Sequence, residues 1–82
     1  MNIHILTREL AKARSARVRG ERPDYWLGYE RGLMRGHRGA GFGTDHDHDL
    51  WLSLAASGDA RLRERGKGYR DGLVVAAAEE AA

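Results

Sequence analysis

Two histidines and three aspartates alternate in one short segment of this chain, Asp45-His46-Asp47-His48-Asp49. On a helix, Asp45 and His48 are three residues apart, as are His46 and Asp49, so two possible metal ligands share a face. A metal site needs three or four ligands, and the others would come from the remaining histidines or the acidic end of the chain. The alternative is a solvated first helical turn, whose acidic residues interact favourably with the helix dipole. We expect this alternative and assign the chain no metal or other cofactor.

Other residue patterns that support catalysis are missing. The sequence contains no cysteine, which excludes a disulfide, a thiolate metal site and a cysteine nucleophile. Its serines lack the context of a nucleophile elbow, and no zinc-protease or phosphate-loop pattern occurs. The glycine-rich stretch 39–43 precedes a predicted helix, a geometry that suits anions, but without a preceding strand or a following lysine it is more typical of a connector. We therefore expect a protein that is not an enzyme.

Positive charge gathers in the first half of the chain. Residues 1–40 hold nine Lys/Arg against four Asp/Glu, whereas residues 41–82 hold five against eight. Arginine binds phosphate and carboxylate through a planar fork, so this asymmetry predicts contact with an anionic surface, although an arginine-rich composition explains it equally well. Tyr25, which lies off the main apolar stripe, is expected to be exposed as an interface anchor. The candidate partner-binding residues are Arg8, Lys12, Arg14, Arg17, Arg19, Arg22, Tyr25, Arg31, Arg35 and Arg38.

The spacing of apolar residues predicts helices that would position these groups. The first helix spans residues 2–19, with Leu6, Leu10 and Ala13 on one face, and Gly20 stops it. Thr7 offers an alternative N-cap, which would leave residues 3–6 as an extended lead-in.

The second predicted helix runs from Pro23 to about His37, since proline suits a first helical turn. Its apolar stripe consists of Trp26, Tyr29 and Leu33, and it is widened by Tyr25, Leu27 and Met34. A loop over residues 38–43 follows, in which Phe42 is the one residue able to anchor the loop to the core.

Two further helices are expected in the second half of the chain. Thr44 is the predicted N-cap of a helix reaching Ser57, with Asp47 in the reciprocal capping position and with Leu50, Trp51 and Leu54 on one face. Asp59 caps a last helix over residues 60–78, which carries Leu62, Tyr69, Leu73 and Ala76 at helical spacing. Residues 79–82 are expected to fray, because glutamate near a helix C-terminus opposes the dipole. The predicted fold is all-α, a single domain over residues 1–82 with three to four short helices.

The element Gly-Tyr-x-x-Gly-Leu occurs at residues 28–33 and again, forty residues later, at 68–73. The glycines continue along the second predicted helix, where Gly28, Gly32 and Gly36 are spaced by four residues and form one row. Each glycine destabilises a helix interior by roughly 0.5–1 kcal/mol relative to alanine, and close approach of another helix is the usual compensation. We therefore expect helices two and four to cross at their glycine faces, in a molecule with internal pseudo-symmetry.

Paired helices of this kind also suggest a family. The segments Trp26-Leu27-Gly28-Tyr29-Glu30-Arg31-Gly32 and Gly68-Tyr69-Arg70-Asp71-Gly72 resemble the two helical elements of the bacterial ribosome modulation factor. This resemblance, which covers about a dozen residues, implies binding at ribosomal RNA. The family's cysteine-proline-tyrosine stretch is absent, the linker here is longer, and an N-terminal helix is added.

These observations favour a small cytoplasmic module that binds a larger protein or ribonucleoprotein complex, without a membrane segment. Chains of this type, cofactor-free and with a split charge, fit inhibitors or adaptors of phage or mobile elements, anti-CRISPR proteins included. The split charge would also allow a homodimer. The alternative is a nucleic-acid-associated protein that places its basic N-terminal helix on RNA phosphates.

Overall fold

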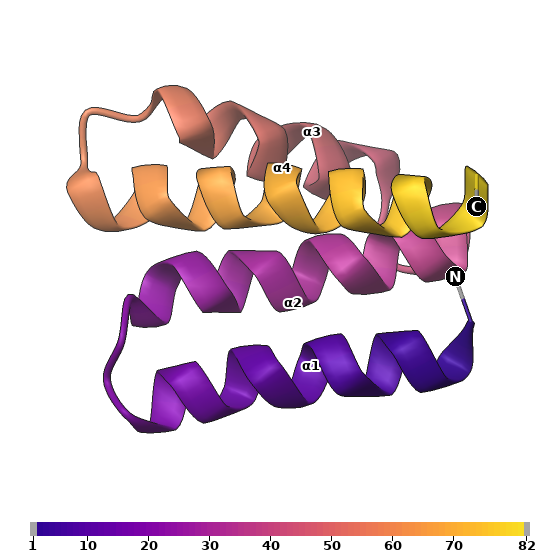
Figure 1. The fold of residues 1–82 in the computed structure, drawn as a ribbon. Coiled ribbons are helices and arrows are strands. Elements are labelled where there is room, and N and C mark those ends of the chain that lie inside the picture. The colour runs from indigo at the N-terminus through magenta and orange to yellow at the C-terminus, as the bar shows by residue number, and fades with distance from the viewer. Residues whose placement is uncertain (1, 82) are drawn as a thin grey trace.

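A computed structural model describes residues 2–81, and over this range the chain forms four α-helices and no β-strand (Figure 1). The helices are α1 (Ile3–Val18), α2 (Pro23–Arg38), α3 (Asp45–Ser53) and α4 (Ala60–Ala81). Short 3₁₀ turns, η1 (Gly39–Gly41) and η2 (Leu54–Ala56), follow α2 and α3. The expected all-α fold is confirmed.

Helices α2 and α4 form the centre of the bundle. They run side by side in the same direction, while α1 lies antiparallel along α2 and α3 lies antiparallel along α4 (Figure 1). The pairs α1–α2 and α3–α4 are therefore two copies of one helical hairpin, which is the internal pseudo-symmetry expected from the repeat.

The predicted crossing of α2 and α4 at their glycine faces is confirmed. A Cβ added to Gly32 would overlap the backbone carbonyl of Tyr69, and one added to Gly72 would overlap that of Tyr29. The first glycines of the two repeats make the same reciprocal contact one turn earlier. Only residues without a side chain allow two helix backbones to approach this closely, and the resulting packing compensates for their low helix propensity.

The core lies around this central pair. Tyr29 and Leu33 of α2 pack against α1, and Tyr69 of α4 packs against α3. Most of its members were expected from the helical spacing. The buried hydrophobic residues are Leu6, Ala13, Ala16, Tyr29, Leu33, Tyr69 and Ala76.

The start of α1 differs from the Thr7 alternative. The Asn2 side chain accepts a hydrogen bond from the backbone N–H of His4 at 2.7 Å and caps the helix. Residues 3–6 are therefore helical. The Thr7 hydroxyl donates to the Ile3 carbonyl at 2.8 Å, one turn back inside the helix, so it caps nothing.

The third helix is shorter than expected, and a different face of it packs on α4. It ends at Ser53 instead of Ser57, and the chain continues as η2. His48 and Trp51, three residues apart, cover Tyr69 and form the face that packs on α4. Leu50 lies off this face and is 51% exposed, so the expectation that it faces the core is wrong.

The last helix begins as expected but ends later. The Asp59 carboxylate caps it by accepting hydrogen bonds from the backbone N–H groups of Arg61 and Leu62. The helix continues through Glu79 and Glu80 to Ala81, so the expected fraying over these residues is wrong; Ala82 lies outside the described residues. The three alanines that precede them have the highest helix propensity of any residue type, which favours continuation.

Candidate functional site

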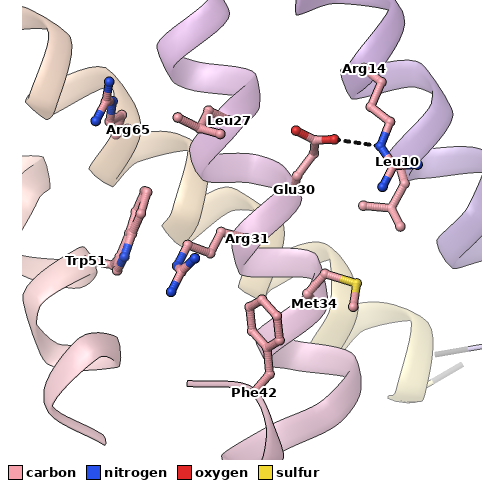
Figure 2. A pocket seen from close by; sticks show the side chains of 9 residues that line it. All are labelled: Leu10, Arg14, Leu27, Glu30, Arg31, Met34, Phe42, Trp51 and Arg65. Atoms are coloured by element: carbon pink, nitrogen blue, oxygen red, sulfur yellow. Dashed lines mark hydrogen bonds and ion pairs between the residues drawn. The ribbon is translucent and has the colours of Figure 1, made fainter. Parts of the chain in front are cut away.

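A groove with a volume of about 440 Å³ lies over the outer face of α2 (Figure 2). Helix α1 borders it on one side, and Phe42 and α3 border it on the other. A volume of roughly 300–1,000 Å³ is typical of ligand pockets. Its lining residues are Leu10, Arg14, Leu27, Glu30, Arg31, Met34, Phe42, Trp51 and Arg65.

The floor of the groove follows the axis of α2. Leu27, Arg31 and Met34 are four and three residues apart, so they stand in one row along the helix and all line the groove. The sequence placed Leu27 and Met34 in the core stripe. In the structure both are half-buried, which leaves an apolar surface open to solvent between α1 and α3.

Arg31 lies between two aromatic rings at the side of this floor. Its guanidinium carbon is 5.4 Å from the ring centre of Phe42 and 5.0 Å from that of Trp51. Both distances suit a cation–π interaction, which is stronger where the cation is partly removed from water. The rings come from the loop and from α3, so the position of Arg31 depends on how these two segments are held.

Arg35 and a capping box hold the loop in place. The Arg35 guanidinium donates hydrogen bonds to the carbonyls of Phe42 and Thr44 and pairs with the Asp45 carboxylate at 3.2 Å. The backbone N–H of Asp47 donates to the Thr44 hydroxyl at 3.0 Å, and the Asp47 carboxylate accepts from the N–H of Thr44 at 3.3 Å. The capping box predicted from the sequence is thereby confirmed. The loop is held by the backbone carbonyl of Phe42, whose half-buried side chain is not part of the core cluster.

The α1 side of the groove carries an ion-pair cluster. Both oxygens of the Glu30 carboxylate are engaged, one by Arg14 at 3.1 Å and the other by Arg17 at 2.8 Å. Only 12% of the Glu30 side chain is exposed, whereas 64% of the Arg14 side chain is exposed. The carboxylate is therefore neutralised, and the rim of the groove is positive on balance.

Most of the other candidate basic residues are paired with carboxylates as well. Arg8 and Lys12 pair with Glu9, and Arg19 pairs with the neighbouring Glu21. Arg22 reaches across to Glu64 of α4 at 2.9 Å. The basic side of α1 is thus a mixed-charge surface, a feature that depends on carboxylates from α2, α4 and the intervening turn.

Two candidates do not fit this pattern. Arg38 is exposed at the end of α2 and has no ion-pair partner among residues 2–81. Tyr25 is half-buried, so the expectation that it is exposed is wrong: its hydroxyl donates to Asp71 at 2.7 Å, and the Arg22 guanidinium lies 4.0 Å from its ring centre. Burial, followed by the bond to Asp71, raises the pKa of Tyr25 to about 12.

The Asp45–Asp49 segment forms the first turns of α3, and three of its side chains make structural contacts. Asp45 pairs with Arg35 and Asp47 completes the capping box. His48 Nδ1 lies 2.6 Å from the Tyr69 hydroxyl, whose pKa is raised by burial. No group of three His, Asp or Glu side chains within residues 2–81 is arranged to hold a metal ion.

Comparisons with protein-family models, curated proteins and solved structures find no match to this chain. The resemblance to ribosome modulation factor therefore stays a prediction. No helix within residues 2–81 combines the length and the hydropathy that crossing a bilayer requires.

Proposed function

We propose that the chain is a protein-binding module whose contact surface is the groove over α2. The observation that carries this proposal is an open apolar floor, formed by Leu27 and Met34, beside a half-buried arginine between two aromatic rings. Desolvated aromatic and arginine side chains supply much of the binding energy at protein interfaces. A module of this kind acts by occupying a surface of a larger complex, as an inhibitor or an adaptor does.

The ion pairs of α1 argue for a protein partner over a nucleic acid. Phosphate binding depends on cations that are free to replace counterions. Here Arg14 and Arg17 are already paired with Glu30, and Lys12 is paired with Glu9, so a phosphate backbone would have to compete with these carboxylates. An apolar groove, in contrast, contributes nothing to binding a polyanion.

A second candidate function is binding to RNA in the manner of ribosome modulation factor. The observation in its favour is that the side chains of Arg8, Lys12 and Arg14 remain largely exposed at 69%, 58% and 64% despite their pairing. Exposed ion pairs are weak, so these cations can exchange partners.

Affinity capture from a bacterial lysate, with and without nuclease, separates the two functions when groove variants are included. Leu27→Glu places a charge on the groove floor at a position that is not part of the core cluster. Val74→Glu is the matched control, because Val74 lies mid-helix in α4, outside the groove, and is 62% exposed. Circular dichroism confirms that both variants fold.

We expect the wild type and V74E to retain one stoichiometric protein partner after nuclease treatment, and L27E to lose it. Capture of ribosomal components that disappear with nuclease, and that L27E retains, would contradict the proposal and support RNA binding. The same capture repeated at increasing salt adds a second test, since RNA binding weakens steeply with salt concentration.

A further inference from the structure

Arg31 stands apart from the other arginines around the groove. Arg14, Arg35 and Arg65 each donate to a carboxylate, at 3.1, 3.2 and 2.8 Å respectively. Within residues 2–81 no carboxylate and no carbonyl accepts a hydrogen bond from the Arg31 guanidinium, and its contacts are the faces of Phe42 and Trp51. The guanidinium thus lies beside two rings, and the Asp47 carboxylate is near enough to interact with it electrostatically, but its N–H donors form no hydrogen bond with the described residues.

This arrangement prepares a guanidinium for an anion. Arginine presents five N–H donors in one plane, and two of them match the two oxygens of a carboxylate. The contacts with the two rings restrict the side chain, and this restriction lowers the conformational entropy lost when a ligand binds. The apolar surroundings reduce competition from water and strengthen a charge-assisted hydrogen bond.

We infer that Arg31, held between Phe42 and Trp51, binds a carboxylate of an acidic amphipathic helix from a partner protein, whose apolar side chains lie on Leu27 and Met34. This inference rests on the proposed function and names the chemistry of the partner. The charges of the groove leave Arg31 to complement such a partner: Glu30 is engaged on both oxygens by Arg14 and Arg17, and Arg65 is paired with Asp24.

The row along α2 indicates a helical occupant. Met34 lies seven residues after Leu27, a rise of about 10 Å at 1.5 Å per residue, and α1 and α3 flank this row on either side (Figure 2). An amphipathic helix laid into such a groove presents residues at i, i+3, i+4 and i+7. Apolar positions on that face reach Leu27 and Met34, and an acidic position between them reaches Arg31.

The test uses the full chain, labelled with ¹⁵N, and three synthetic 18-residue peptides. The first peptide is amphipathic, with leucine on one face and glutamate beside it. The second replaces each glutamate by glutamine and the third replaces each by lysine. The signals followed by NMR are the Arg31 Nε–H and the Trp51 indole N–H, with the Trp26 indole as internal reference because Trp26 is not part of the groove lining.

We expect the glutamate peptide to shift the Arg31 and Trp51 signals and leave Trp26 unchanged. Since a hydrogen bond to a charged group contributes more than a neutral one, the glutamine peptide should bind about tenfold more weakly or worse, and the lysine peptide should not bind. Equal binding of the glutamate and glutamine peptides would overturn the inference, as would a failure of the glutamate peptide to shift the groove signals.

Two arginine variants complete the experiment. Arg31→Gln should weaken binding of the glutamate peptide about tenfold, and Arg31→Lys, which keeps the charge without the fork, should be intermediate. Arg38→Gln is the matched control, an arginine of the same helix that lies outside the groove and is unpaired among the described residues. If R31Q and R38Q bind the peptide equally, Arg31 is not the binding point.

Different results would overturn the role of Arg31 and the role of the groove as the contact surface. A cellular partner that is lost with L27E but binds R31Q as well as the wild type leaves the groove as the contact surface and overturns the role of Arg31. A single-stranded RNA that shifts the α1 arginines and not the groove overturns both.

Discussion

Tyr29 and Tyr69 occupy equivalent positions in the two halves of the molecule, and each hydroxyl bonds to a different outer helix. The Tyr29 hydroxyl donates to Glu9 of α1 at 2.8 Å, whereas the Tyr69 hydroxyl lies 2.6 Å from His48 Nδ1 of α3. Both rings are buried beside the glycine contact of α2 and α4. The repeat thus supplies two functions at once: its glycines bring the central helices together, and its tyrosines attach the outer helices to them.

The glycine contact should tolerate substitution less than any other part of the fold. Gly32→Ala places a Cβ on the Tyr69 carbonyl, which forces α2 and α4 apart. Overpacking of this kind costs about 1–3 kcal/mol of unfolding free energy, and more where backbone is displaced, or roughly 4–8 °C in Tm per kcal/mol for a domain of this size. Gly41→Ala is the control, because nothing lies within 4 Å of a Cβ there. A Tm for G32A equal to that of G41A would contradict the close approach.

The two candidate N-cap threonines should behave in opposite ways. Thr44→Ala removes the acceptor for the Asp47 N–H and should lower the unfolding free energy by about 1 kcal/mol. Thr7→Ala removes only a hydroxyl that bonds one turn back in α1, and alanine has the higher helix propensity, so stability should stay the same or rise. Urea unfolding followed by circular dichroism measures both. Destabilisation by T7A comparable to that of T44A would restore Thr7 as a cap.

Parts of this structure follow from the sequence because they depend on local or repeated signals. The capping box needs only Thr44 and Asp47 three residues apart. The glycine crossing follows from glycines spaced by four residues, because they destabilise a helix unless another helix packs against them. The groove has no such signal. Leu27 and Met34 have the spacing of core residues, and only the position of α3, which brings Trp51 to within 5.0 Å of the Arg31 guanidinium, leaves the space above them open.

The long-range ion pairs likewise could not be predicted from the sequence. Arg14 and Glu30 are 16 residues apart and meet only because α1 folds back along α2. The sequence of the N-terminal helix is basic. In the fold, most of its cations are paired with carboxylates, so a partner would contact a surface of mixed charge.

Stability should fall on acidification as the Asp24 carboxylate is protonated. The hydrogen bond from Arg65, with a further one from Arg61, outweighs burial and holds the pKa of Asp24 below its ordinary value. Because the pKa is lower in the folded state, the stabilisation is fully present above the unfolded-state pKa and is lost as the pH falls through the folded-state pKa. Asp24→Asn should therefore cost about 1–2 kcal/mol at pH 7.

The difference in unfolding free energy between the wild type and D24N should narrow below about pH 4, the ordinary pKa of an aspartate, and disappear once the pH has fallen through the lower folded-state pKa. Chemical unfolding of both proteins across this range measures it. Asp49→Asn serves as the control, since Asp49 has no ion-pair partner among residues 2–81. This substitution should change the unfolding free energy little at neutral or at acidic pH. A D24N difference that is constant with pH would show that the carboxylate charge is not the stabilising feature.

Glu30 should determine how strongly α1 binds a polyanion. It pairs with both Arg14 and Arg17, so Glu30→Gln releases two guanidinium groups on one face of α1 while changing the net charge by one unit. Binding of poly(U) should strengthen in E30Q, and the slope of log K against log salt should steepen by about 1.4, since each cation contributes roughly 0.7 on a single strand. Asp49→Asn makes the same change in net charge without releasing an ion pair. If D49N and E30Q bind poly(U) equally, the gain reflects net charge alone. If E30Q leaves both affinity and slope unchanged, the pairing with Glu30 does not restrain these arginines, and the basic face of α1 is open to RNA as it stands.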